Sequence, residues 1–89
     1  MEILKTNRQG CSKVTGSIVI CYNIMESNGS VRELMGSIQK DAVNLGTVTI
    51  YDGGRVVLYF DDANGLTYKE QKAVFGKAMD DAETIFKSE

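Results

Sequence analysis

Residues 47–51 and 55–60 constrain the fold most, because the pairing between these two apolar-rich runs can be worked out. They are separated by Asp52-Gly53-Gly54, which is typical of a hairpin turn. A two-residue loop at the two glycines would scatter the aliphatic side chains over both faces. A three-residue loop instead pairs Ile50 with Val56 and Val48 with Leu58. We therefore predict a hairpin whose apolar face carries Val48, Ile50, Val56, Leu58 and Phe60.

Two Ser/Thr-x-x-Glu sequences, at 30–33 and 67–70, each follow an Asn-Gly pair. This pattern is typical of a capping box at a helix start. Apolar residues spaced by three and four follow both, so we predict helices over about 31–45 and from 67 almost to the C-terminus. The first apolar face is Val31, Leu34, Met35, Ile38, Ala42 and Leu45; the second is Phe75, Ala78, Met79, Ala82, Ile85 and Phe86. Gly36 and Gly76 fall inside these helices, where a missing side chain would allow close packing.

Residues 16–25 alternate apolar side chains onto both faces, which predicts a strand in the middle of a sheet. A weaker strand over 2–8 is expected to pair with it through a loop around 9–13. The element order is then ββαββα, and 89 residues correspond to a single domain, 1–89. We predict an α+β fold with a four-stranded, mostly antiparallel sheet and two helices packed on one face.

Several chemistries are disfavoured by composition. The chain has no histidine, which excludes Ser-His-Asp and Cys-His catalytic units and disfavours an enzyme without settling the question, and we expect no cofactor or metal site. Asp61–Gly65 has only part of the ligand pattern of a calcium loop, and a turn before the second helix explains it. Cys11 and Cys21 are expected to be free thiols, and with no apolar run long enough to span a membrane we predict a cytoplasmic protein.

The sheet face opposite the two helices has no predicted element to cover it. The residues expected there are Val19, Cys21, Thr49, Tyr51, Arg55, Val57 and Tyr59. Exposed apolar and aromatic groups in one area often mark an interface, and a twofold contact needs only one self-complementary surface. We therefore predict protein–protein association through this face, most simply as a homodimer. An ordinary solvated sheet face is the alternative to a binding surface.

Two other functions remain open. Tyr51 and Tyr59 beside Arg55 could stack unpaired bases of single-stranded nucleic acid, although a net charge of −2 disfavours binding to a phosphate backbone. A pocket between helix and sheet could serve a small-molecule enzyme or sensor.

Overall fold

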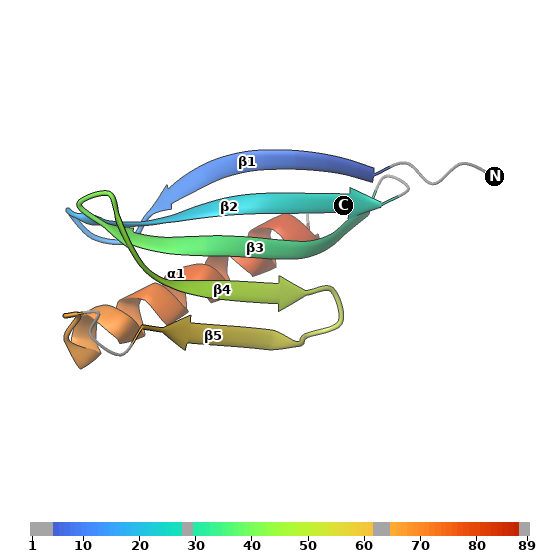
Figure 1. Ribbon diagram of the computed structural model, residues 1–89. Helices are drawn as coiled ribbons and strands as arrows, with labels where there is room; N and C mark the ends of the chain where they lie inside the picture. Colours follow the sequence, from blue (N-terminus) through green and yellow to red (C-terminus); the bar gives the residue numbers. More distant parts are fainter. Residues whose placement is uncertain (1–4, 28–29, 62–64, 88–89) are drawn as a thin grey trace.

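The computed structural model describes residues 5–27, 30–61 and 65–87, and it shows a five-stranded antiparallel sheet with one helix packed behind it (Figure 1). The strands follow the chain in order across the sheet, β1-β2-β3-β4-β5. The elements are β1 Lys5–Lys13, β2 Ile18–Ser27, β3 Ser30–Lys40, β4 Val43–Tyr51, β5 Val56–Phe60 and α1 Tyr68–Lys87.

The predicted ββαββα layout with four strands and two helices is wrong. The segment expected to form the first helix, about 31–45, instead forms β3, a turn and the beginning of β4. The β4–β5 hairpin is confirmed with its predicted register, because Ile50 pairs with Val56 and Val48 with Leu58. The sheet therefore gains a strand and loses a covering helix.

A glycine and a bulge explain why β3 has helical spacing. Leu34, Gly36 and Ile38 occupy alternate positions on the buried side of β3, and the glycine leaves an apolar spacing of four. The register of β3 against β2 shifts so that Arg32 has no partner, and Val31 and Leu34 are both buried although three residues apart. Spacings of three and four thus arise here from a strand.

The turn after β3 uses two residues in the left-handed region. Asp41 and Ala42 have φ values of 51° and 67°, and they connect the paired residues Lys40 and Val43. Positive φ at both central residues is typical of the type I′ hairpin turn. The backbone thus reverses at the point where a helix was expected to continue.

The second capping box is confirmed. The N–H of Thr67 donates to Glu70 Oε1 at 2.9 Å, and the N–H of Glu70 donates to Thr67 Oγ1 at 3.1 Å. The bond from the Thr67 backbone is the main reason that the pKa of Glu70 lies below its usual value. Lys40 Nζ also lies 3.3 Å from Glu70 Oε2, which links the start of α1 to the end of β3.

The β1–β2 hairpin, which carries both cysteines, differs partly from expectation. β2 is an inner strand, as predicted, and it pairs with the N-terminal strand. The predicted loop at 9–13 is wrong, because β1 continues to Lys13 and the connection lies at 14–17. Residues 2–4 of the predicted strand lie outside the described residues.

The core lies between α1 and one face of the sheet, and its buried members come from β2, β3, β4, the helix and the segment just before the helix. They are Ile18, Ile20, Tyr22, Val31, Leu34, Ile38, Val48, Ile50, Leu66, Val74, Ala78 and Ala82. The helix makes its main contact with β3, the middle strand. Gly36 lies in this contact region, where a Cβ would be 2.7 Å from Ile20 Cγ2 and 2.9 Å from Val48 Cγ1.

Replacing Gly36 with alanine should therefore destabilise the fold by about 2 kcal/mol, because branched neighbours cannot easily move aside. Gly76 is the matched control: it lies exposed in α1, with no atom within 4 Å of a Cβ there. Gly76→Ala should stabilise the protein by about 1 kcal/mol. Urea unfolding of both variants measures this, and a Gly36→Ala variant at least as stable as wild type would contradict the packing.

Candidate functional site

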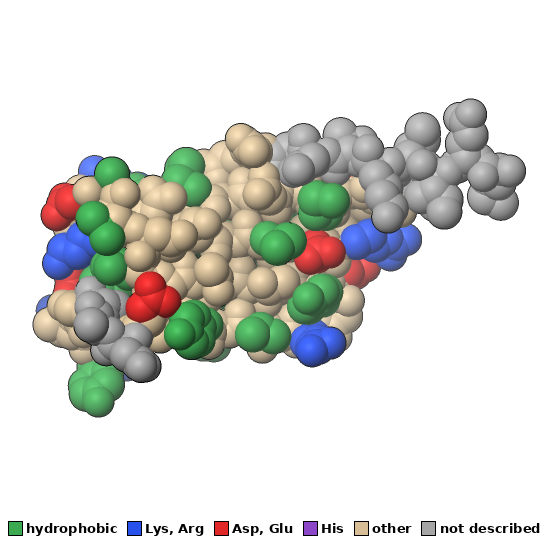
Figure 2. All heavy atoms as spheres, viewed as in Figure 1, with side chains coloured by type: hydrophobic (Ala, Val, Ile, Leu, Met, Phe, Trp, Pro, Cys, Tyr) green, Lys and Arg blue, Asp and Glu red, His purple; other side chains and the backbone are tan. Residues whose placement is uncertain are grey.

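The face of the sheet that points away from α1, here called the open face, is turned toward the viewer in Figure 2. Because Ile18, Ile20 and Tyr22 are buried on the helix side, the alternate residues of β2 lie on the open face. The same alternation on β4 and β5 places there the other strand residues that the sequence suggested: Val19, Cys21, Thr49, Tyr51, Val57 and Tyr59. Arg55 lies in the turn before β5, with its guanidinium carbon 5.3 Å from the centre of the Tyr51 ring.

These residues form two groups, because β3 lies between β2 and β4. Val19 and Cys21 belong to the β2 side, and the remaining five belong to β4, β5 and their turn. Met35 on β3 stands between the two groups and was missed, since its segment was assigned to a helix. Its position on the open face could have been predicted only by assigning Leu34, Gly36 and Ile38 to one face of a strand, which places Met35 on the opposite face.

An apolar patch lies at the β5 side of the open face. Met35, Thr49 and Val57 are consecutive partners across three strands, and Tyr59 follows Val57 on the same face. Met35, Val57 and Tyr59 are 48%, 47% and 55% exposed. We call Met35, Val57 and Tyr59 the open-face patch. In Figure 2 the charged side chains lie mainly toward the two ends of this face, and its middle is largely uncharged.

Asn23 extends the same row of residues, as the partner of Met35 on β2. Its Oδ1 atom is buried and accepts no hydrogen bond from the described residues. A hollow of about 210 Å³ lies beside it, lined by Gln9, Ser37 and both cysteines among others. A buried acceptor without a donor is uncommon in proteins, so this row has unused hydrogen-bonding capacity.

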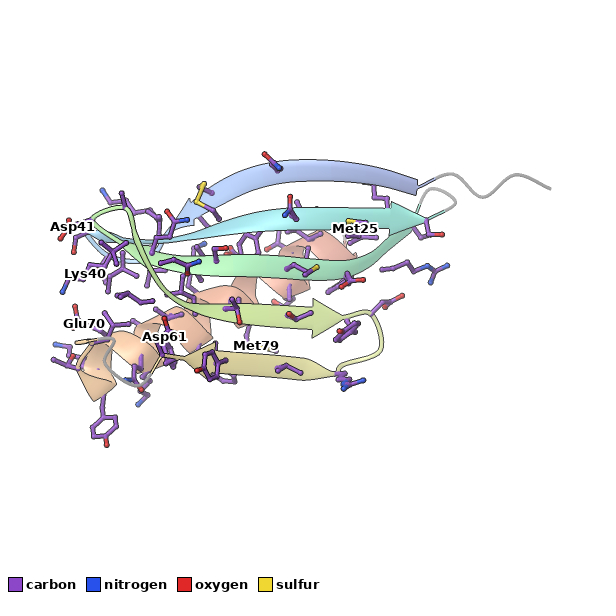
Figure 3. All side chains as sticks on the ribbon, in the orientation of Figure 1. Met25, Lys40, Asp41, Asp61, Glu70 and Met79 are labelled. Atoms are coloured by element: carbon purple, nitrogen blue, oxygen red, sulfur yellow. A yellow bond between two sulfur atoms is a disulfide. The ribbon has the colours of Figure 1, made fainter. Side chains whose placement is uncertain are left out.

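The two cysteines form a disulfide, so the prediction of free thiols is wrong. Cys11 and Cys21 are direct partners in the β1–β2 register, with their Cα atoms 4.0 Å apart. Their pairing could not be deduced from a spacing of ten residues, because it depends on where the hairpin turns. The bond lies on the open face and joins the edge strand β1 covalently to β2 (Figure 3).

The disulfide is important for β1 because this strand has little apolar surface of its own. Opposite the buried Ile20 and Tyr22 it places Ser12 and Gly10. Backbone hydrogen bonds to β2 and the disulfide therefore hold β1, with little contribution from hydrophobic burial.

Reducing the Cys11–Cys21 bond should lower the free energy of unfolding by about 3 kcal/mol, since it closes a short loop of the unfolded chain. Amide exchange in β1 should also accelerate. The measurement compares oxidised protein, reduced protein and the Cys11→Ser/Cys21→Ser variant, which should match the reduced form. Equal stability and equal amide protection of β1 in all three proteins would contradict the conclusion that the disulfide holds β1 to β2.

On the other side of the sheet, a hydrogen-bonded group fixes α1 to β2. The buried Tyr22 hydroxyl donates to Asp81 Oδ2 at 2.8 Å, and Lys77 Nζ donates to Asp81 Oδ1 at 2.8 Å. Burial is the main cause that raises the pKa of Tyr22, and the bond to Asp81 adds to it. The same carboxylate raises the pKa of Lys77.

Stability should therefore fall as the pH rises above about 10, because folded Tyr22 keeps its proton when unfolded tyrosine loses it. Tyr22→Phe should be less stable at neutral pH by about 1 kcal/mol and should lose stability less steeply above pH 10. The raised pKa of Lys77 also lowers stability at high pH, and it does so in both the wild type and Tyr22→Phe. Tyr68→Phe, at a ring that is 87% exposed, is the control for urea unfolding across pH 8–11. Identical slopes for wild type and Tyr22→Phe would contradict this assignment.

A hollow of about 380 Å³ lies on the helix side, between α1 and the β4–β5 turn, and Ile50, Val56 and Phe86 contribute its apolar walls. Asp52, Asp80 and Glu83 are its acidic lining residues. Asp52 is paired with Arg32 at 3.3 Å. The lining combines apolar walls with carboxylates and includes no serine, cysteine or lysine.

No known protein family, curated protein or solved structure matches this chain. In the described ranges, no helix combines the length and the apolar character needed to cross a membrane.

Proposed function

We propose that the chain is a protein-association module that binds a second copy of itself through the open face. The observation that supports this most is the open-face patch. Its three side chains come from β3 and β5 and are each about half exposed. Val57 and Tyr59 are neighbours on one face of β5, and Met35 lies two strands away, beyond Thr49. Burying apolar side chains of this kind would give a contact its main driving force.

The charge of the open face favours a second copy as the partner. A twofold contact brings each charge toward its own counterpart, so a strongly charged face would repel itself. The middle of this face is largely uncharged (Figure 2). An uncharged middle is therefore compatible with self-association.

Single-stranded nucleic acid is a weaker candidate. The Arg55 guanidinium lies over the Tyr51 ring, and this limits the ring as a stacking platform for bases. Lys13 and Arg55 are far apart in the sheet, on β1 and beside β5, so they do not form a basic track for a phosphate backbone.

The cellular location remains a prediction. Cytoplasmic residence was expected together with free thiols, whereas disulfides persist mainly in oxidising compartments. The Cys11–Cys21 bond therefore favours an oxidising compartment over the cytoplasm as the place where the module acts.

The variant Tyr59→Glu should weaken the dimer at least about tenfold, because it places a carboxylate in the buried patch. Tyr68→Glu is the matched control: it makes the same change at a tyrosine that is 87% exposed, at the start of α1. Sedimentation equilibrium of the oxidised proteins measures both dissociation constants. A wild type that stays monomeric at high concentration would contradict the proposal, as would equal weakening by both variants.

A further inference from the structure

The two edges of the sheet differ in how open they are to another strand. β1 contains three basic residues in the sequence KTNRQGCSK, and it is joined to β2 by the disulfide. β5 has the sequence VVLYF, without charge, proline or glycine. Edge strands are templates for further pairing unless charge, proline or a covering element blocks them. The β5 edge lacks the first two kinds of block.

The backbone groups available on β5 follow from the bonds at its ends. Tyr51 N–H donates to the Arg55 carbonyl at 2.8 Å, and Asp61 N–H donates to the Leu45 carbonyl at 2.9 Å. Residues 55 and 61 therefore direct their ladder groups toward β4, and alternation gives residues 57 and 59 the same direction. The N–H and C=O groups of Val56, Leu58 and Phe60 point the other way. Within the described residues, no strand pairs with this outer edge.

We infer that the β5 strands of two copies pair antiparallel across a twofold axis beside Leu58, which extends the sheet through both molecules. This inference rests on the proposed self-association and restricts the contact to the β5 side of the open face, where Val57 and Tyr59 lie, so that Met35 on β3 stays outside it. Leu58 would face Leu58 of the second copy, and Val56 would face Phe60. These are the residues with free outward backbone groups, so each pair could exchange both of its N–H···O bonds.

The side chains of VVLYF are self-complementary in this register. Val57 would stand opposite Tyr59 of the second copy on the open face, and Val56 would stand opposite Phe60 on the helix side. Both are pairs of an aromatic with a β-branched residue, which stabilise antiparallel sheets. The pairing would also bring the two open-face patches side by side, because Val57 and Tyr59 are half exposed at this edge.

A closed dimer also fits better than pairing of β5 with β1 of another copy. Such a contact would join two different edges, leave one of each kind free, and propagate into a filament. The twofold β5 contact uses up the uncharged edge of both copies and leaves the β1 edges, with their basic residues, at the two ends of the extended sheet.

Residue-resolved amide exchange of the oxidised wild type tests the pairing. The Leu58 amide should exchange at least about tenfold more slowly at concentrations where the dimer is populated than after dilution to monomer. The Val57 amide is the internal control, since it faces β4 in either state. A populated dimer with an unprotected Leu58 amide would overturn the edge pairing and leave the proposed function standing. A chain that is monomeric at every concentration would overturn both.

Two further variants separate pairing at the edge from stacking of open faces. Met35→Glu changes the patch on β3, two strands away from β5, and edge pairing predicts a dissociation constant within about threefold of wild type. Val57→Lys, at the edge itself, should weaken the dimer at least about tenfold. Equal weakening by Met35→Glu and Val57→Lys would overturn the edge pairing. Retained folding of each variant is checked by circular dichroism.

Discussion

A single amphipathic helix covers the sheet in the described part of the chain, and the rest of the structure depends on this constraint. One helix is about 10 Å wide, whereas five strands span roughly twice that width. α1 therefore lies along the middle strand, and the core is concentrated on β2, β3 and β4 around Gly36. The Tyr22–Asp81 bond and the Lys40–Glu70 pair hold the helix there.

Because α1 is narrower than the sheet, three parts of the sheet lie outside its cover, and each differs from the core in a specific way. β1 lies outside the core, with Ser12 and Gly10 opposite the buried Ile20 and Tyr22, and a covalent bond to β2 holds it in place. β5 is apolar but only partly buried, and no other described strand pairs with the backbone groups at its outer edge. The open face carries half-exposed Met35, Val57 and Tyr59. Association with a second copy would bury apolar surface that α1 does not cover.

The sequence predicted correctly those features that depend on residues close together in the chain. The turn at 52–54 determines the β4–β5 register, and the box at Thr67 and Glu70 forms as expected. The similar box at 30–33 fails because β3 pairs on both sides, and strand pairing outweighs a capping pattern. Gly36 and the bulge at Arg32 give the strand β3 an apolar spacing like that of a helix, and Met35 was missed for this reason. The disulfide was missed for a different reason, because the expected loop at 9–13 contained Cys11, which instead lies in β1 opposite Cys21.

The most direct test of the account is a set of nuclear Overhauser contacts from the methyl groups of Val74 and Ala78. If α1 covers one face only, these methyls should contact the side chains of Ile20, Leu34 and Ile38, and none of them should contact Met35 or Val57. Contacts from α1 to Met35 or Val57, or helical chemical shifts through residues 31–40, would contradict the packing of α1 on one face of the sheet. The open face, the attachment of β1 by the disulfide and the outer edge of β5, left unpaired by the described strands, all depend on that packing.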